Sequence, residues 1–227
     1  MNLTANNDYE RAINAHYADA GDLEAAIDQG LRAAGKDPAA LTPEDLRGVD
    51  QFHLGGHGAT RALWALAGVP RGARVLDVGG GLGGAARTLA READCRVTVL
   101  DLTAAFARVG ARLTARTGLS ERVRFGQGDA TRLPFGAASF EVVWMQHSTM
   151  NIPDKAALFA EAARVLRPGG RLALHEVLSG PGGAARFPVP WARTAALSFL
   201  EAPERMRGLI GAAGLSERAW VDVTAEA

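Results

Sequence analysis

Cysteine, an excess of charge of one sign and long apolar runs are scarce or absent in this sequence. Cys95 is the only cysteine among 227 residues, which excludes a disulfide within the chain and favours a cytoplasmic setting. Because Cys95 lies in an apolar, alternating run, we expect it to be a small core residue.

The two signs of charge balance. Lys and Arg together number 25, as do Asp and Glu, so the formal net charge at pH 7 is zero. Proteins that bind nucleic acids usually carry a basic excess that neutralises phosphates. We therefore expect a small-molecule substrate and no nucleic-acid partner, while a homo-oligomer stays open.

No apolar run reaches the roughly 18 residues that a membrane-spanning helix needs. The first eight residues are polar and lack the apolar centre of a signal peptide. The hydrophobic share of 48% and the charged share of 22% are typical of globular domains. The sequence thus predicts a soluble cytoplasmic protein with no membrane partner, of one domain and a modest appendage.

The first 70 residues show helical patterns and no strand-like runs. Apolar residues recur every fourth position over 22–34 behind a capping Asp22, which predicts an amphipathic helix. Thr42-Pro43 indicates a second helix start, with proline at the first helical position. A third helix is expected over 59–67. We interpret residues 1–70 as an N-terminal helical cap.

Strands and helices alternate from residue 71 onward, which we interpret as the core domain, 71–227. The expected strands are 73–78, 96–102, 122–126, 140–145 and 170–178, and the expected helices are 83–93, 104–117 and 155–166. This alternation predicts an α/β fold with a Rossmann-like, doubly wound, mostly parallel sheet. Ligands of such sheets bind at the carboxyl ends of the strands.

The segment after the fifth strand is rich in proline. Residues 181–190 hold three prolines and two glycines and cannot form a regular element. We expect 179–200 to act as a lid over the site, with helical structure over 191–200. A helix over 203–213 and a last strand over 220–223 follow.

The run Val75–Gly84 carries the main motif. An apolar strand ends at Asp77, and glycines then turn the chain into a helix whose free N–H groups can cradle a nucleotide-like ligand with a carboxylate. Gly79, Gly81 and Gly84 also satisfy the dinucleotide fingerprint. Asp101 after the second strand fits both ligands, since each has ribose hydroxyls. A nicotinamide-dependent oxidoreductase therefore stays open at this point.

Four further features separate these two interpretations. Asp77 stands two residues before the first glycine, and Gly128-Asp129-Ala130 follows the third strand. Ser139–Val143 opens the fourth strand, and Arg164–Leu172 reaches the fifth through a Pro-Gly-Gly turn. In this order and spacing, residues 73–178 closely resemble the class I S-adenosylmethionine-dependent methyltransferases.

A narrower likeness lies in Asp50–His53, Ala59–Arg61 and Gly83–Arg87. These segments resemble the sarcosine/dimethylglycine methyltransferase branch of small-molecule enzymes, whose relatives include natural-product tailoring enzymes. The family sheet normally ends with two strands after the fifth, and here only 220–223 is expected. The resemblance therefore implies that the last strand is missing or that a partner covers that edge.

The resemblance implies S-adenosylmethionine as cofactor and S-adenosylhomocysteine as product. Gly79, Gly81 and Gly83 would lie against the methionine part of the cofactor. Asp77 would organise that loop or meet the methionine amino group through water. Gln146, just past the fourth strand, would contact the cofactor near its sulfonium.

The resemblance also implies the adenosine contacts. Asp101 would bind the two ribose hydroxyls, with Leu102 packing on the adenine. Asp129 would accept from the adenine amino group, helped by the backbone N–H of Ala130.

The expected reaction is methyl transfer to an O, N or C nucleophile of a small molecule, which needs a base only when a proton must leave. His147 is the first candidate, because its unperturbed pKa of about 6.5 suits proton removal, although a backbone-bonded histidine in a tight loop is the alternative. His53 is a second candidate at the join of cap and core. Glu176 either orients the substrate or forms a salt bridge beneath the loop at Pro181.

No pair of these side chains has tight metal-ligand spacing, so we expect no metal. Three other functions stay open beside methyl transfer. They are a nicotinamide-dependent oxidoreductase, a methyltransferase-like fold that catalyses a non-methylating reaction such as cyclisation, and a non-catalytic binding module.

Overall fold

The computed structural model describes residues 22–226, so the first 21 residues of the expected cap and Ala227 lie outside the described part. Five strands form one sheet: β1 (Arg74–Val78), β2 (Arg96–Asp101), β3 (Val123–Gln127), β4 (Phe140–Gln146) and β5 (Leu166–His175). Their order is β3-β2-β1-β4-β5, and every pairing is parallel. The α/β, Rossmann-like, doubly wound sheet is confirmed.

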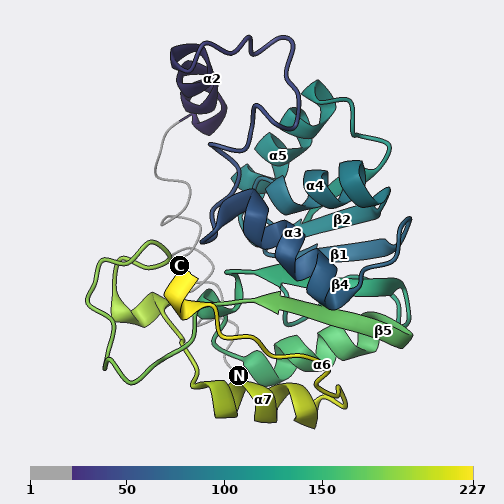
Figure 1. The fold of residues 1–227 in the computed structure, drawn as a ribbon, viewed down its shortest axis with the longest axis vertical. Helices are drawn as coiled ribbons and strands as arrows, with labels where there is room; N and C mark the ends of the chain where they lie inside the picture. The colour runs from purple at the N-terminus through teal and green to yellow at the C-terminus, as the bar shows by residue number, and fades with distance from the viewer. Residues whose placement is uncertain (1–21, 227) are drawn as a thin grey trace.

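Helices cover both faces of this sheet, as Figure 1 shows. The helices are α2 (Leu23–Ala33), α3 (Gly56–Ala67), α4 (Gly84–Ala93), α5 (Ala104–Arg116), α6 (Lys155–Val165) and α7 (Pro203–Ala212). Short 3₁₀ turns, η1 (Thr149–Asn151), η2 (Ala195–Leu197) and η3 (Thr224–Glu226), complete the described elements. Helices α3, α4 and α5 contact one side of the sheet, and α6 and α7 form the layer on the other.

Successive residues of β1 enter opposite core clusters because side chains alternate across a strand. Val75 packs with apolar residues of α3 and α4, whereas Leu76 and Val78 pack with α6 and Met206 of α7. All three β1 side chains are buried. This two-sided burial explains why the strands appear in the sequence as continuous apolar runs rather than as alternating ones.

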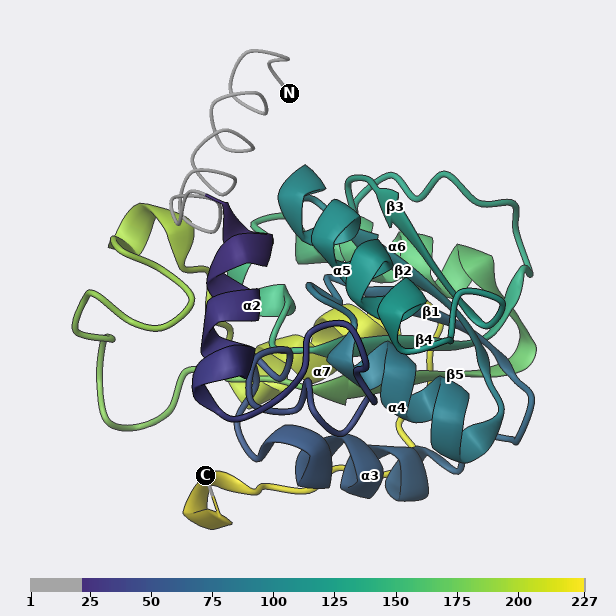
Figure 2. The ribbon, with the colours of Figure 1, turned by 90° about the horizontal axis from the view of Figure 1, so that it is seen from above.

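A third cluster attaches the cap. Ile27 and Leu31 of α2 pack with Leu46, with Leu82 of the glycine loop and with Phe106 of α5. Figure 2 shows α2 lying beside α5. The described part of the cap therefore packs at the level of the glycine loop, where ligands of parallel sheets bind.

The strand order places a switch point between β1 and β4. From β1 the chain proceeds to β2 and β3 on one side, and it then returns to β4 and β5 on the other. The connections at this point leave β1 and β4 in opposite directions and open a crevice at the carboxyl ends of the strands.

Three expected elements differ from the structure. Residues 42–49 form turns instead of a helix, because the N–H groups of Asp45, Leu46 and Arg47 bond three residues back and Gly48 follows. Over 191–200 the chain forms turns and only the short η2.

The expected last strand over 220–223 is also wrong. Trp220 instead packs beneath the guanidinium of Arg207, whose Cζ lies 4.0 Å from the centre of the Trp220 ring. Trp220 also lies against the cluster of α6 and α7. Within residues 22–226 no strand follows β5, as the prediction of a missing last strand requires. No helix in this part of the chain is long and apolar enough to cross a membrane.

Candidate active site

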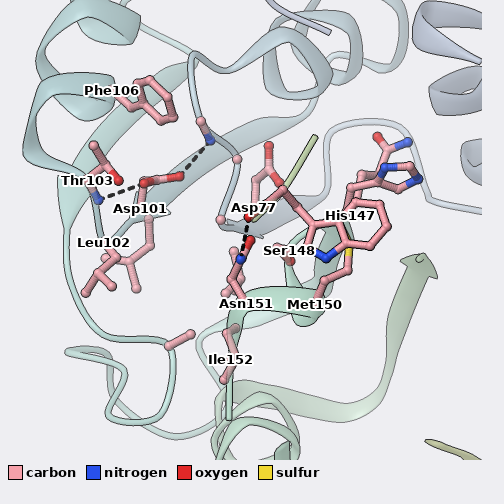
Figure 3. Close-up of a pocket in the computed structure, with 18 of the residues that line it drawn as sticks. Asp77, Asp101, Leu102, Thr103, Phe106, His147, Ser148, Met150, Asn151 and Ile152 are labelled. Atoms are coloured by element: carbon pink, nitrogen blue, oxygen red, sulfur yellow. Dashed lines mark hydrogen bonds between the residues drawn. The ribbon is translucent and has the colours of Figure 1, made fainter. Parts of the chain in front are cut away.

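A cavity of about 680 Å³ opens at the carboxyl ends of β1, β2 and β4. Figure 3 shows its side chains converging from strand ends and from the following loops. Ten of the residues singled out in the sequence line it: His53, Asp77, Gly79, Gly81, Asp101, Leu102, Asp129, Ala130, Gln146 and His147. This volume lies within the range of about 300–1,000 Å³ that is common for small-molecule sites.

The glycine loop forms one wall. Gly79 and Gly81 have φ values of +70° and +55°, which favour glycine. Gly80 has an ordinary φ, but a Cβ there would lie 2.5 Å from Asp77 Oδ2 and 2.9 Å from the Val99 side chain. The loop therefore needs glycine at 80 for space and at its two neighbours for backbone conformation.

Asp101 ends β2 with both carboxylate oxygens engaged. Oδ2 accepts from the Gly81 N–H at 2.9 Å, and Oδ1 accepts from the Thr103 N–H at 2.8 Å (Figure 3). Burial raises the pKa of Asp101, and these two backbone bonds oppose the rise. Because each oxygen has a further lone pair, the side chain can still accept from ligand hydroxyls.

Asp77 is almost wholly buried at 1% exposure, and its Oδ2 has no hydrogen-bond partner in the described chain. Burial, with a smaller contribution from the Asp101 charge, raises the pKa of Asp77 to about 7. A buried carboxylate without a partner is costly unless a ligand pairs with it. Asp77 therefore fits a ligand group that donates hydrogen bonds, such as an amine.

Asp129 follows β3, at the opposite end of the cavity from β4. Its Oδ1 accepts from the backbone N–H and the hydroxyl of Thr131, each at 2.8 Å. Ala130 and Leu102 line the cavity beside it. The β3 end thus combines a fixed carboxylate with apolar surface, which suits a flat heterocycle with an exocyclic amine.

Gln146 ends β4, and its side chain is 8% exposed. Its Oε1 accepts from Trp144 Nε1 at 2.9 Å and from Thr60 Oγ1 at 3.0 Å. Its Nε2 is buried and has no partner in the described chain.

Three histidines meet beside Gln146. The ring centres of His147 and His175 are 4.9 Å apart, and the His53 ring centre lies 6.1 Å from each. Burial, followed by the proximity of the other two histidines, lowers the pKa of His147 to about 4. Burial also lowers the pKa of His53 and His175. The three rings are therefore uncharged at neutral pH.

His147 has a φ of +51°, an unusual backbone conformation for a residue with a side chain. Its N–H donates to the His175 carbonyl at 2.9 Å, which ties the loop after β4 to β5. Strained residues of this kind are concentrated at functional sites. The backbone thus turns the His147 ring toward the cavity, which it lines.

Two expected site residues lie elsewhere. Gly83, with a φ of +81°, caps the start of α4, and a Cβ there would lie 2.5 Å from the Phe125 ring. It does not line the cavity, because it faces the packing between α4 and β3.

Glu176 also lies outside the cavity lining, and it forms no salt bridge with the chain near Pro181. Its carboxylate accepts from the N–H groups of Ser148 at 3.2 Å and Thr149 at 3.1 Å. Burial raises the pKa of Glu176 to about 7 against these bonds. Glu176 thus supports the loop that carries His147.

Comparison with known proteins shows which family the sheet and its loops resemble. Residues 76–174, which hold β1 to β5 almost completely, match the family model described as a methyltransferase domain. Residues 76–174 are therefore similar to the methyltransferase domain family. The resemblance in the chain's motifs is thereby confirmed.

Two curated relatives extend this match. The methyltransferase GfsG of Streptomyces halstedii is 35% identical over 134 residues, which cover 59% of this chain and 48% of GfsG. The dimethylglycine N-methyltransferase of Parasynechococcus marenigrum is 29% identical over 156 residues, covering 69% of this chain and 56% of that protein. The chain thus spans about half the length of these relatives.

Solved structures show the same fold. The [4+2]-cyclase SpnF matches with a TM-score of 0.64 and 25% identity, covering 85% of this chain and 68% of SpnF. A phosphoethanolamine N-methyltransferase 2 of Haemonchus contortus, solved with S-adenosylhomocysteine, gives a TM-score of 0.62 and 25% identity. That match covers 70% of this chain and 37% of the nematode protein.

Sequence reasoning missed several residues around the cavity. Phe52 of the cap stacks on Phe106 with ring centres 5.9 Å apart, and both line the cavity. His175 completes the histidine cluster although it lies outside the lining. The strand-end position of His175, matching that of Gln146, is the one signal that the sequence offered for it.

The proline-rich segment meets the cavity through Pro190 and Trp191. Asn151 Nδ2 fixes it by donating to the carbonyls of Trp191 at 2.8 Å and Leu197 at 2.9 Å. The buried Lys155 Nζ donates to the Phe199 carbonyl. Side chains after β4 thus hold the segment expected as a lid at the cavity mouth.

The described residues contain no group of three or more potential ligands suited to a metal ion.

Proposed function

We propose that the chain binds S-adenosylmethionine in this cavity and transfers its methyl group to an O, N or C nucleophile of a small molecule. The observation that carries the proposal is the row of acidic side chains and glycine backbone at three neighbouring strand ends. Asp129 follows β3, Asp101 ends β2, and Asp77 lies beside the β1 loop. The row leads to Gln146 and the histidines at β4.

The order of these groups matches the parts of the cofactor. Neighbouring strands lie about 4.8 Å apart, so the cavity extends about 15 Å from β3 to β4. Asp129, Ala130 and Leu102 would hold the adenine, and Asp101 the ribose hydroxyls. The orphaned Asp77 oxygen fits the methionine amino group, and the backbone of Gly79 and Gly81 lies beside it.

S-adenosylmethionine supplies, when bound, a methyl group on a sulfonium centre that a nucleophile can displace. The chain's residues have to orient the acceptor, exclude water and accept any proton that leaves. His147 is the proposed base, because it is uncharged, lines the cavity and lies at the β4 end. The acceptor's proton would move to a His147 ring nitrogen.

His53 and Glu176 would assist from either side. His53 lines the cavity from the cap and faces His147 at 6.1 Å. Glu176 would act as a positioning residue, since it holds the N–H groups that follow His147 and does not reach the cavity. Natural-product tailoring is the role that we propose for the reaction, because the motifs resemble a branch that contains such enzymes.

Cyclisation is the second candidate, favoured by the similarity to the cyclase SpnF over 85% of this chain. Methyl transfer and cyclisation would both use the cavity with its adenosyl ligand. They differ in whether the cofactor's methyl group is transferred to the substrate. Mass spectrometry of the product separates them, since cyclisation by itself adds no methyl group.

Calorimetric titration tests the proposal. S-adenosylhomocysteine, S-adenosylmethionine and NAD are titrated into wild type and Asp101→Asn, with the exposed Asp222→Asn as control. Loss of a charged acceptor for the ribose should weaken adenosyl binding by about tenfold or more in Asp101→Asn alone. A folded wild type that binds NAD and neither adenosyl ligand would contradict the proposal and favour the oxidoreductase.

A further inference from the structure

The orientation of the Gln146 amide is fixed by its neighbours. Trp144 lies two residues earlier on β4, so both side chains point to the same face. An indole N–H can only donate, so the Gln146 atom at 2.9 Å from Trp144 Nε1 must be the oxygen. Thr60 Oγ1 donates to that same oxygen at 3.0 Å.

The Gln146 NH₂ group consequently points away from both donors. It brings two N–H donors to a place where the described chain offers no acceptor. Gln146 itself lines the cavity and is more than nine-tenths buried. Since a buried donor without a partner is costly, this geometry indicates a ligand atom that accepts hydrogen bonds.

Thr60 extends the arrangement into the cap. It is fully buried on α3, and His53 Nε2 lies 3.3 Å from its hydroxyl oxygen. His53 Nδ1 lies 3.4 Å from the Leu54 carbonyl oxygen, so the single N–H of the neutral His53 ring donates either to Leu54 or to Thr60. Thr60 of α3 and Trp144 of β4 thus both hold the Gln146 amide oxygen.

We propose that Gln146 Nε2 binds an oxygen atom of the methyl acceptor, so that the site takes hydroxyl, phenol or enol substrates and not ammonium ones. This inference rests on the proposed function, which assigns the β2 and β3 ends of the cavity to the cofactor. The side chains around the Gln146 amide support it. His53 and His147 are uncharged rings, and Asp50, elsewhere in the cavity lining, is engaged by Arg87 at 2.7 Å. Once the methionine amino group of the cofactor occupies Asp77, an ammonium group would meet N–H donors here without a free carboxylate.

Nuclear magnetic resonance of ¹⁵N-labelled wild type tests the inference without turnover. The Gln146 side-chain resonances are identified by their absence in Gln146→Glu, which keeps the oxygen for Trp144 and Thr60 and removes the donor. S-adenosylhomocysteine is added first, and then phenol or benzylammonium. We expect phenol to shift the Gln146 resonances saturably and benzylammonium to leave them in place.

Three outcomes would overturn the inference. Phenol leaves the Gln146 resonances unmoved, benzylammonium moves them equally, or S-adenosylhomocysteine alone produces the whole shift. Failure of the proposed function looks different, because S-adenosylhomocysteine would then move no resonance of the Gly79–Gly81 loop.

Thr60 is proposed as a positioning residue for this amide. Thr60→Val keeps the side-chain shape but removes the hydroxyl, and should weaken phenol binding by about tenfold with S-adenosylhomocysteine affinity unchanged. Thr60→Ser should restore it. Thr88→Val is the matched control, because the buried Thr88 hydroxyl donates to a helix carbonyl, that of Gly84. Equal phenol affinity in Thr60→Val and wild type would refute this role.

Discussion

Carboxyl groups with raised pKa values gather around the candidate site. Burial raises the pKa of both Asp77 and Glu176 to about 7, and raises that of Asp101. Such groups are less stable when ionised in the fold than in the unfolded chain. At the residue scale, ionisation of these buried carboxyl groups therefore lowers the stability of the fold.

Asp77 makes stability depend on pH. Its pKa is higher in the fold, about 7, than the ordinary 3.8, so between these values the native state binds more protons than the unfolded state. The free energy of unfolding then falls as pH rises from about 4 to about 7, by up to about 4 kcal/mol. Asp77→Asn removes this dependence. Urea unfolding at several pH values should give a shallower decline in the variant, and parallel curves would contradict the account.

Glu176 has a structural role that can be measured. Glu176→Ala leaves the N–H groups of Ser148 and Thr149 without their acceptor and should lower the free energy of unfolding by about 2–4 kcal/mol. Glu176→Gln keeps one acceptor and should lose less. Chemical denaturation checks this, with the exposed Glu121→Ala as control. Equal stability of Glu176→Ala and the control would show that these bonds contribute nothing.

At the scale of elements, residues with regular apolar periodicity were predicted well. The helices 104–116 and 155–165 and the strand 140–146 differ by one residue from expectation, because their burial follows the local pattern. The start of β5 differs more, since Leu166 pairs with Phe140 across a register shift before the turn at Pro168.

Elements held by distant side chains were not predictable. Residues 191–200 take their path from Asn151 and Lys155, about 40 positions earlier in the sequence. Trp220 suggested a strand by its type, but it packs under Arg207. The local sequence around these residues does not indicate such distant partners.

Contacts between residues distant in sequence also limited the prediction of the site. The resemblance to the methyltransferases implied that Asp77, Asp101 and Gln146 contact the cofactor, and all three line the cavity, because parallel strands end at one edge. Gly83 was indistinguishable from Gly81 in sequence, yet it faces Phe125. The histidine cluster and the Thr60–Gln146 bond depend on the tertiary packing of α3 and the sheet.

A buried ion pair joins the cap to α4. Arg87 Nη2 lies 2.7 Å from Asp50 Oδ2, and the side chains are 1% and 2% exposed. Asp50→Asn leaves the guanidinium without its counter-charge and should destabilise the fold by about 3 kcal/mol. Glu217→Gln breaks the exposed pair with Arg207 and should cost less than about 1 kcal/mol. Thermal or urea unfolding measures the stability of both variants. Equal losses of stability would contradict the conclusion that the Asp50–Arg87 pair is the stronger of the two.

Asn151 holds the proline-rich segment in place. Asn151→Ala removes the donor to Trp191 and Leu197 and should speed amide exchange across residues 190–199. Hydrogen exchange followed by mass spectrometry measures this, with the strands as internal reference. Unchanged protection of 190–199 would mean that other contacts, such as that of Lys155, suffice.

At the scale of the whole molecule, three regions enclose one cavity. The sheet edge supplies the acidic row and Gln146, the cap supplies Phe52 and His53, and the proline-rich segment supplies Trp191. In the proposed function, the switch point between β1 and β4 separates a cofactor end of the cavity from an acceptor end. The central claim is that the adenosyl group lies over β2 and β3 and the reacting centre at β4.

A crystal structure with S-adenosylhomocysteine tests this claim most directly. The account predicts ribose hydroxyls within hydrogen-bonding distance of the Asp101 carboxylate, adenine beside Asp129, and the thioether sulfur nearest Gln146. An adenine ring found among His53, His147 and Gln146, or a ligand bound outside the cavity, would contradict it.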